Sequence, residues 1–178
     1  DDVTEWFWLL HDDCAPHADS LRRLLSAAIT YDADVVGPKV LDFDGRRHLV
    51  ELGLTITGAG RRYTGLEGDE RDQGQHDDRR DVLAVGTAGM LVRRDAWDSL
   101  GGLDPQIDVF RDDVDFGWRA RLADYRVVVE PSAVVEHAAA ATRGRRRLSS
   151  TRDRGPLVDR RNAVPVMLAN ASRWALVP

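Results

Sequence analysis

The stretch Trp6-Phe7-Trp8-Leu9-Leu10-His11-Asp12-Asp13 decides how this chain should fold, because an apolar run of strand length stops abruptly at two adjacent carboxylates. A run that is apolar at every position is typical of a strand buried on both faces, as in a parallel sheet. Ligands of open α/β sheets lie just outside the carboxyl ends of the strands. Paired carboxylates there suit a hard divalent cation that also holds phosphate oxygens. A loop whose Asp caps the following helix explains the same pair, and the segment alone leaves both interpretations open.

Composition places the chain among soluble globular domains. Its 178 residues fit one domain with a substantial core, and the net charge of −5 argues against nucleic acid as a partner. Cys14 is the only cysteine, which excludes an intramolecular disulfide and favours a reducing compartment. We find no signal peptide and no apolar stretch long enough to span a bilayer. Because the chain opens almost directly on a core strand, we expect the interior of a longer protein.

Strands and helices alternate along the chain, which predicts an α/β fold with a mixed sheet flanked by helices. Strands or extended segments are predicted at residues 34–41, 48–57, 82–92, 126–129 and 133–137. Helices are predicted after Asp19 or Ser20, after Asp95 and over residues 112–123. Pro38 indicates a strand near a sheet edge. Residues 61–81 are expected to form a long mobile loop, and residues 142–155 an Arg-rich flexible loop.

Asp112, Asp113 and Asp115 crowd the first turn of a predicted helix. Acids at a helix start complement the macrodipole and cap free N–H groups. Three carboxylates within four residues exceed what capping requires. Their mutual repulsion destabilises the helix start, and a bound cation or hydroxyl would offset that repulsion. Repulsion also raises the pKa of one of them, which makes a better proton acceptor near neutrality.

His137 closes the extended run Val134-Val135-Glu136-His137. A histidine at a strand end is commonly structural or solvent-exposed. Considered together with Asp13, it becomes a candidate metal ligand, because imidazole and carboxylate together suit Mn²⁺ or a similar ion.

These segments together resemble the GT-A catalytic domain of glycosyltransferase family 2, and are closest to actinobacterial members that build cell-envelope polysaccharides. The matching segments are residues 11–13 (His-Asp-Asp), residues 86–94 with the helix end at residues 101–104, residues 111–121 and residues 131–137. Their order and spacing across most of the chain make the resemblance fairly specific.

The resemblance implies an inverting, metal-dependent, non-processive transfer from a nucleotide-diphosphate sugar to a hydroxyl of a glycan or lipid-linked acceptor. Asp13 and His137 would hold the divalent metal, Mn²⁺ or Mg²⁺, and Asp113 would be the catalytic base. The other implied site residues bind the donor or the acceptor: His11, Asp12, Thr87, Ala88, Gly89 and Asp112. The expected location is cytoplasmic, at the inner face of the cell membrane within a larger protein.

Two of the departures from the family pattern bear directly on the site and on the extent of the domain. His11 replaces the first acid of the usual motif, which leaves metal binding more dependent on Asp13 and His137. The strands that hold the base and ribose of the donor should precede residue 1, so residues 1–155 would be a partial catalytic domain. Residues 156–178 are expected to be a helix or a juxtamembrane segment, with the helix starting at Pro165 and with possible membrane surface contact.

Other patterns carry less weight. His11, Cys14 and His17 are evenly spaced, but a structural zinc site needs a fourth ligand and no second cysteine exists. Arg143, Arg145, Arg146 and Arg147 suit either a solvated loop or contacts with a diphosphate or an anionic lipid. Two rival functions stay open: a non-catalytic sugar-nucleotide-binding or scaffold domain, and a metal-dependent nucleotidyltransferase.

Overall fold

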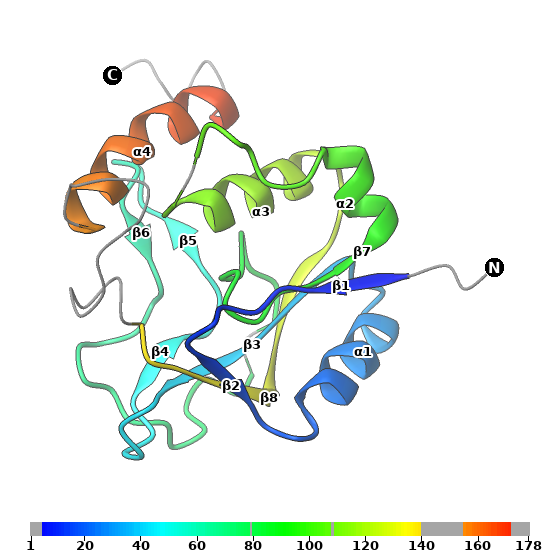
Figure 1. Cartoon of the computed structure of the whole chain (residues 1–178), viewed down its shortest axis with the longest axis vertical. Helices are drawn as coiled ribbons and strands as arrows, with labels where there is room; N and C mark the ends of the chain where they lie inside the picture. The colour runs from blue at the N-terminus through cyan, green and yellow to red at the C-terminus, as the bar shows by residue number, and fades with distance from the viewer. Residues whose placement is uncertain (1–4, 79, 108, 140–154, 172–178) are drawn as a thin grey trace.

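The computed structural model describes residues 5–78, 80–107, 109–139 and 155–171. These ranges form a mixed six-stranded sheet, a two-stranded hairpin and four helices (Figure 1). The sheet order is β1-β7-β3-β8-β2, with β4 also paired to β3, and β5 and β6 form the hairpin. The strands are β1 (Trp6–Trp8), β2 (Cys14–Pro16), β3 (Val35–Asp42), β4 (Leu49–Glu51), β5 (Thr55–Ile56), β6 (Arg62–Tyr63), β7 (Leu91–Arg93) and β8 (Val127–His137). The helices are α1 (Ser20–Thr30), α2 (Arg94–Leu100), α3 (Asp112–Leu122) and α4 (Gly155–Asn170). The predicted α/β class and mixed sheet are confirmed.

The centre of the sheet is the parallel pair β3 and β8. Every residue of β3 is buried, so the prediction that Pro38 marks an edge is wrong. The register shifts between Pro38 and Lys39: Pro38 pairs with Glu130, and Lys39 pairs with Val134. A residue without an N–H fits a central strand only at such an irregularity. The two extended pieces predicted at residues 126–129 and 133–137 are therefore one strand with an interruption.

The strand β1 forms where the opening apolar run predicts it, but not as a buried parallel strand. It pairs antiparallel with β7, and its residues are half-buried. Phe7 packs on one core cluster, and Trp6 and Trp8 pack on another, which explains why the run is apolar at every position. Within the described residues β1 pairs with a strand on one side only, which accounts for its partial exposure.

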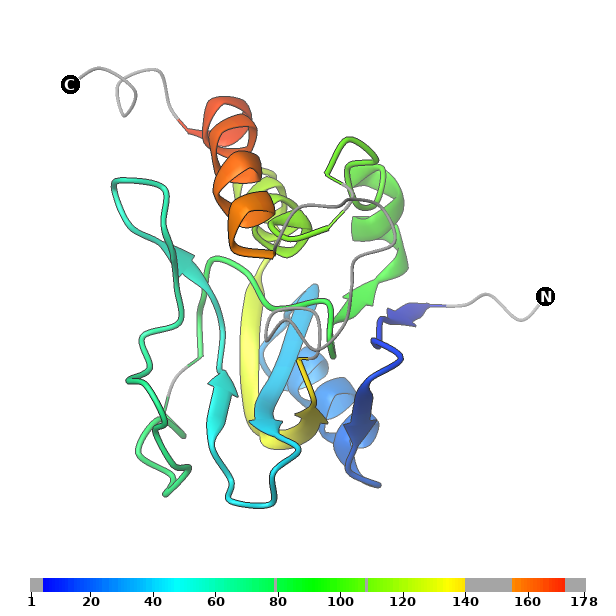
Figure 2. The ribbon, with the colours of Figure 1, turned by 60° about the vertical axis from the view of Figure 1, so that its left-hand side comes forward.

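Helices cover both faces of the sheet (Figure 2). On one face, α1 buries Leu24, Ala27 and Ala28 in a cluster with residues of β3, β7 and β8. On the other face, Ala96 of α2 and Phe116 of α3 join the cluster around Val35 and Val127. This arrangement places the first turn of α3 above the sheet, close to the β5–β6 hairpin (Figure 1).

The helix α4 packs on α3 through polar anchors as well as apolar ones. Its buried residues recur every four positions: Val158, Asn162, Val166 and Asn170. Arg111, which is 3% exposed, forms a two-pronged ion pair with Asp159 at 2.6 and 2.9 Å. Asn170 donates a hydrogen bond to Asp115 at 2.8 Å. The helix begins at Gly155 and contains Pro165 in its interior, so the expected start at Pro165 is wrong.

Among the described residues, no helix has the length and apolarity needed to cross a membrane. The four arginines at residues 143–147 lie outside the described residues. The predicted loop at residues 61–81 begins with β6, and Lys39 anchors it through Asp72 at 2.7 Å and Asp77 at 2.6 Å. The mobility of this segment stays a prediction.

Candidate functional site

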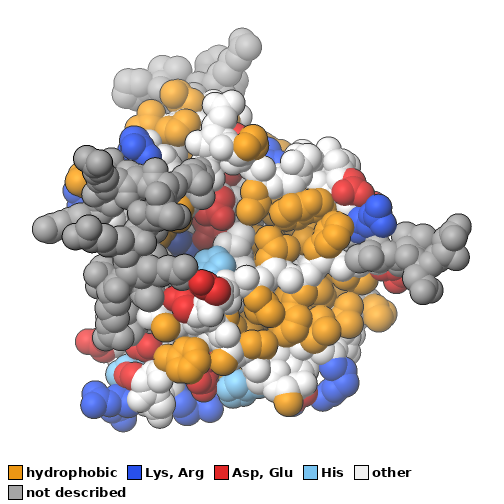
Figure 3. Space-filling model, viewed as in Figure 1, with side chains coloured by type: hydrophobic (Ala, Val, Ile, Leu, Met, Phe, Trp, Pro, Cys, Tyr) orange, Lys and Arg blue, Asp and Glu red, His pale blue; other side chains and the backbone are white. Residues whose placement is uncertain are grey.

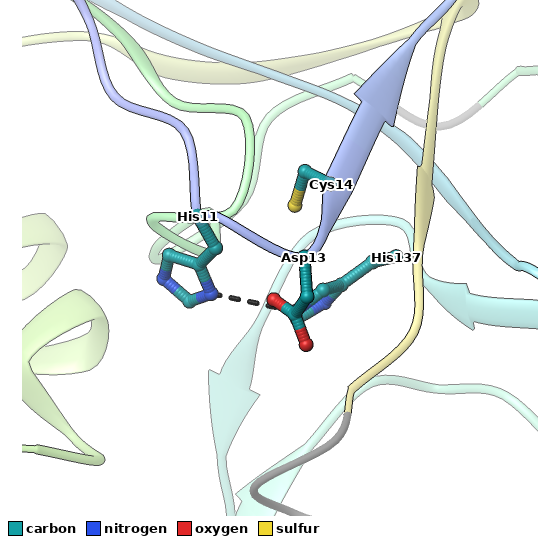
Figure 4. A group of neighbouring side chains, drawn as sticks. All are labelled: His11, Asp13, Cys14 and His137. Atoms are coloured by element: carbon teal, nitrogen blue, oxygen red, sulfur yellow. Dashed lines mark hydrogen bonds and ion pairs between the residues drawn. The ribbon is translucent and has the colours of Figure 1, made fainter. Parts of the chain in front are cut away.

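The antiparallel pairing of β2 with β8 brings Asp13 and His137 together, although they are 124 residues apart in the chain. Cys14 pairs with His137 in this register, and Asp13 lies in the turn just before it. The Oδ1 atom of Asp13 is 3.0 Å from Nε2 of His137. The same ring nitrogen is 3.4 Å from Nδ1 of His11. Figure 4 shows these side chains and that of Cys14 pointing toward one another.

Four side chains thus form one candidate metal-binding group. One ligand atom each from His11, Asp13, Cys14 and His137 lies within 4.8 Å of the other three. Burial raises the pKa of the Cys14 thiol to about 11, and the charges of Asp13 and Asp12 act in the same direction. Burial and the His137 ring lower the pKa of His11, although nearby carboxylates oppose them.

Residues 86–89 lie directly against this group. Thr87 Oγ1 is hydrogen-bonded to Nε2 of His11 at 2.9 Å. The carbonyl oxygen of Ala88 accepts from the Cys14 thiol at 3.3 Å, and that of Gly89 accepts from the Trp8 indole at 3.1 Å. Thr87 and Ala88 are 8% and 6% exposed. The segment predicted to line a sugar pocket therefore also fixes His11 and Cys14 in place.

The acidic start of α3 supplies a second group. Asp113 is 5% exposed; its Oδ1 accepts from the backbone N–H of Val114 at 2.7 Å, and its Oδ2 accepts from Arg62 at 2.7 Å. Asp115 accepts from Arg119 and Asn170, so its role is to hold helices together. The three acids predicted as one cluster are thus divided between the site and the core.

Two residues of this group, Glu51 and Arg62, have no motif in the sequence that marks them. Arg62 Nη2 donates to Oε2 of Glu51 at 2.9 Å as well as to Asp113. The Oε1 atom of Glu51 accepts from the backbone N–H of Gly86 at 2.6 Å. Burial raises the pKa of Glu51, partly offset by Arg62. Glu51 and Arg62 therefore connect Asp113 to the segment that supports the metal-binding group.

Hydrogen bonds link the two groups. Asp113 is connected through Arg62 and Glu51 to the backbone of Gly86, and the next residue, Thr87, is hydrogen-bonded to His11. Figure 3 shows acidic and histidine side chains together in a hollow of this face. Burial, followed by repulsion from Asp113, raises the pKa of Asp112 to about 7. The raised pKa predicted for one of the acids is thus found at Asp112.

The sequence itself matches a known family. A family model described as "Glycosyltransferase like family 2" matches residues 3–154. The chain belongs to this family. No curated protein matches it.

The fold of this family 2 chain is similar to that of solved structures at low sequence identity. A structure described as GalNAc-T7 with UDP, GalNAc and Mn²⁺ is 13% identical, with a TM-score of 0.60 over 94% of this chain and 32% of that chain. The A197 protein from STIV is 14% identical, with a TM-score of 0.44 over 75% of this chain and 57% of that one. The chain thus spans 32% of the length of the first of these proteins and 57% of the second. The likeness to GalNAc-T7 confirms the expected GT-A-like fold.

The possible ligand atoms of His11, Asp13 and His137 in this family 2 chain suit a divalent metal ion. A carboxylate and imidazoles suit Mn²⁺ and similar ions, whereas Mg²⁺ prefers an all-oxygen shell. His17, the third member of the evenly spaced trio, turns away and lies 3.4 Å from Glu136. His17 is therefore not a member of the candidate group, in which Asp13 and His137 join His11 and Cys14.

A cavity of about 490 Å³ lies elsewhere on the molecule. It is lined by residues of the β5–β6 hairpin, by residues 81–83 and by Arg121. None of the predicted site residues lines this cavity. The candidate site is therefore identified by the short distances between its side chains and not by a cavity.

Proposed function

We propose that this chain is the catalytic part of an inverting, metal-dependent, non-processive glycosyltransferase. It would move a sugar from a nucleotide-diphosphate donor to a hydroxyl of a glycan or lipid-linked acceptor. Family membership supports the reaction class, and the GT-A-like fold supports the architecture. The observation that carries the proposal is the pairing of Asp13 with His137, together with the hydrogen bonds that link Asp113 through Arg62 and Glu51 to Gly86, the neighbour of Thr87.

Asp13 and His137 would hold the divalent cation, Mn²⁺ in preference to Mg²⁺. When bound, the ion neutralises charge that develops on the diphosphate leaving group. Asp12, which follows His11 in the same turn, would contact the donor. Thr87, Ala88 and Gly89 would line the sugar side of the pocket, where their small side chains leave room.

Asp113 would accept the proton of the attacking hydroxyl. Its Oδ2 atom forms an ion pair with Arg62 at 2.7 Å. Because the backbone N–H of Val114 donates to Oδ1 of Asp113 and Arg62 donates to its Oδ2, the carboxylate keeps one position. A base fixed opposite the departing diphosphate gives inversion at the sugar carbon, since the acceptor then attacks from the face away from the leaving group.

Asp112 is the rival for the role of base. Its pKa of about 7 matches what a general base requires at neutral pH. We assign Asp112 to orienting the acceptor, because a carboxyl that still carries its proton at neutral pH can donate a hydrogen bond to the acceptor oxygen.

The test compares Asp113→Asn with Asp112→Asn in the full-length protein, assayed with Mn²⁺ against a panel of nucleotide sugars. Loss of a base typically lowers the rate by about 10²–10⁴-fold. We expect Asp113→Asn to lose transfer and to keep its affinity for the donor in calorimetry, and Asp112→Asn mainly to raise the KM for the acceptor. Retained turnover in Asp113→Asn with loss in Asp112→Asn would exchange the two roles.

We further propose that residues 1–155 form part of a catalytic domain in a larger protein that acts in cell-envelope polysaccharide synthesis, at the cytoplasmic face of the membrane. The ion pair of Asp113 with Arg62 favours this over a scaffold domain, which has no need of a fixed base. If no nucleotide sugar stabilises the protein in a thermal-shift screen with Mn²⁺, but a nucleoside triphosphate does, the nucleotidyltransferase alternative is the better one.

A further inference from the structure

The metal-binding group contains more ligands than the transfer reaction needs. Asp13 and His137 are sufficient to hold an ion that shares its shell with a donor diphosphate. His11 and Cys14 extend the group to two imidazoles, a carboxylate and a thiol. Sulfur and nitrogen ligands in a set of four are typical of Zn²⁺ and atypical of Mn²⁺ or Mg²⁺.

The spacing of the ligand atoms fits a tetrahedral ion. Two nitrogens that each lie about 2.0–2.1 Å from a tetrahedral Zn²⁺ are about 3.3–3.4 Å apart. The Nδ1 atom of His11 and the Nε2 atom of His137 are 3.4 Å apart, and Asp13 Oδ1 is 3.0 Å from the latter. No pair among the four ligand atoms exceeds 4.8 Å, so a side-chain shift of about 1 Å completes the shell.

A neighbouring group already orients one of these ligands. Thr87 Oγ1 is hydrogen-bonded to Nε2 of His11, which leaves Nδ1 facing the group. Hydrogen-bond partners of this kind fix the ring orientation of metal ligands. The Cys14 thiol donates to the backbone oxygen of Ala88 at 3.3 Å, and it must exchange this hydrogen bond for the bond to the ion. His11 is therefore preorganised for an ion, whereas the Cys14 side chain has to turn.

We propose that His11, Asp13, Cys14 and His137 together bind Zn²⁺ in the absence of a sugar donor and that the zinc-bound state excludes the donor. Binding releases the thiol proton to solvent, and the thiolate sulfur becomes the fourth ligand. Four protein ligands close the shell, as in structural zinc sites, so no coordination position is left for a diphosphate. The exclusion of the donor rests on the proposed function, whereas the ion site itself does not.

The direct test is the absorption spectrum of the full chain titrated with Co²⁺, which takes the place of Zn²⁺. Cys14 is the only cysteine, so any thiolate-to-cobalt charge-transfer band must come from it. We expect this band together with intense visible bands of tetrahedral cobalt, and we expect added Zn²⁺ to abolish both. Cys14→Ser should lose the charge-transfer band while keeping its circular dichroism spectrum and its melting temperature.

Two histidine variants distinguish this site from the evenly spaced trio. His137→Ala should weaken Zn²⁺ binding by at least about tenfold. His17→Ala is the matched control and should bind Zn²⁺ as the wild type does, because His17 faces Glu136. A cobalt spectrum without a thiolate band, or a His17→Ala variant that loses the band while His137→Ala keeps it, would overturn the proposal.

A second measurement separates this proposal from the transferase function. The cobalt spectrum is recorded without nucleotide or sugar, so it does not depend on turnover. In the full-length protein, Zn²⁺ should inhibit Mn²⁺-supported transfer, and Cys14→Ser should relieve that inhibition by at least about tenfold. A thiolate band without any transfer would refute the proposed function and leave the zinc site standing, whereas transfer without a thiolate band would do the reverse.

Discussion

Arg62 holds the carboxylate of Asp113 with its Nη2 atom at 2.7 Å, although 51 residues separate the two in the chain. The same nitrogen lies 2.9 Å from Glu51. Asp113 and Glu51 are both buried, and repulsion from the charge of Asp113 contributes to the raised pKa of Glu51. Arg62 offsets that repulsion, so the position of the β5–β6 hairpin and the charge state of the candidate site depend on each other.

Replacing Arg62 with Ala should destabilise the protein, because it leaves two buried carboxylates without their cation. Breaking a buried pair costs about 3–5 kcal/mol, and the partial exposure of Arg62 reduces our expectation to about 2–4 kcal/mol. The measurement is urea unfolding at pH 7. Arg61→Ala, at the exposed neighbouring position, is the control. Equal free energies of unfolding for the two variants would contradict the role given to Arg62.

Asp112→Asn should change how stability depends on pH. The pKa of Asp112 is raised from 3.8 to about 7, so over this range the folded state holds a proton that the unfolded state releases. This contribution to stability is complete below about pH 4 and is lost as the pH rises to about 7. Asn cannot ionise, so the variant should be more stable than the wild type at pH 8, by about 1 kcal/mol or more and at most about 4 kcal/mol.

The check is the difference in free energy of unfolding between pH 5 and pH 8. Asp124→Asn is the control, because Asp124 is exposed and has a φ of +63°, a conformation that Asn also adopts readily. If Asp112→Asn and the wild type show parallel pH profiles, the raised pKa is not present.

Gly86→Ala should disturb the link between Glu51 and the segment that supports His11. A Cβ atom at position 86 would lie 2.8 Å from both carboxylate oxygens of Glu51, so the carboxylate must move. We expect a loss of about 1–3 kcal/mol in thermal unfolding. Gly58→Ala is the matched control, since a Cβ at position 58 meets nothing within 4 Å. A loss in Gly86→Ala no larger than in Gly58→Ala would show that Glu51 yields without cost.

Lys39→Met should release the segment that follows β6. Lys39 is 4% exposed and joins Asp72 and Asp77 to the central strand β3. Without this ammonium group, we expect amide hydrogen exchange over residues 70–78 to accelerate by about tenfold or more, equivalent to about 1.4 kcal/mol of local stability. Arg46→Met, at an exposed position of the β3–β4 connection, is the control. Unchanged exchange would mean that other contacts hold the segment.

Local sequence patterns located most of the elements. The apolar spacing of α1, the acidic start of α3 and the glycine at the end of α2 each depend on residues within a few positions of one another. Gly101, with a φ of +74°, ends α2 as expected. Local patterns failed where an element depends on distant partners. The strand β3 carries a proline in the centre of a sheet because its neighbour β8 is irregular at the same level.

By itself, the sequence determined the α/β class and the residues that carry charge at the carboxyl end of β1, at the start of α3 and at the end of β8. Only the tertiary structure decided which of these side chains meet. Cys14 faces His137 because the register of β2 on β8 aligns the two, and Arg62 reaches Asp113 because the β5–β6 hairpin lies near α3. The physical reason is that coordination and ion pairing act over a few ångströms in space, whereas sequence patterns report only neighbours along the chain.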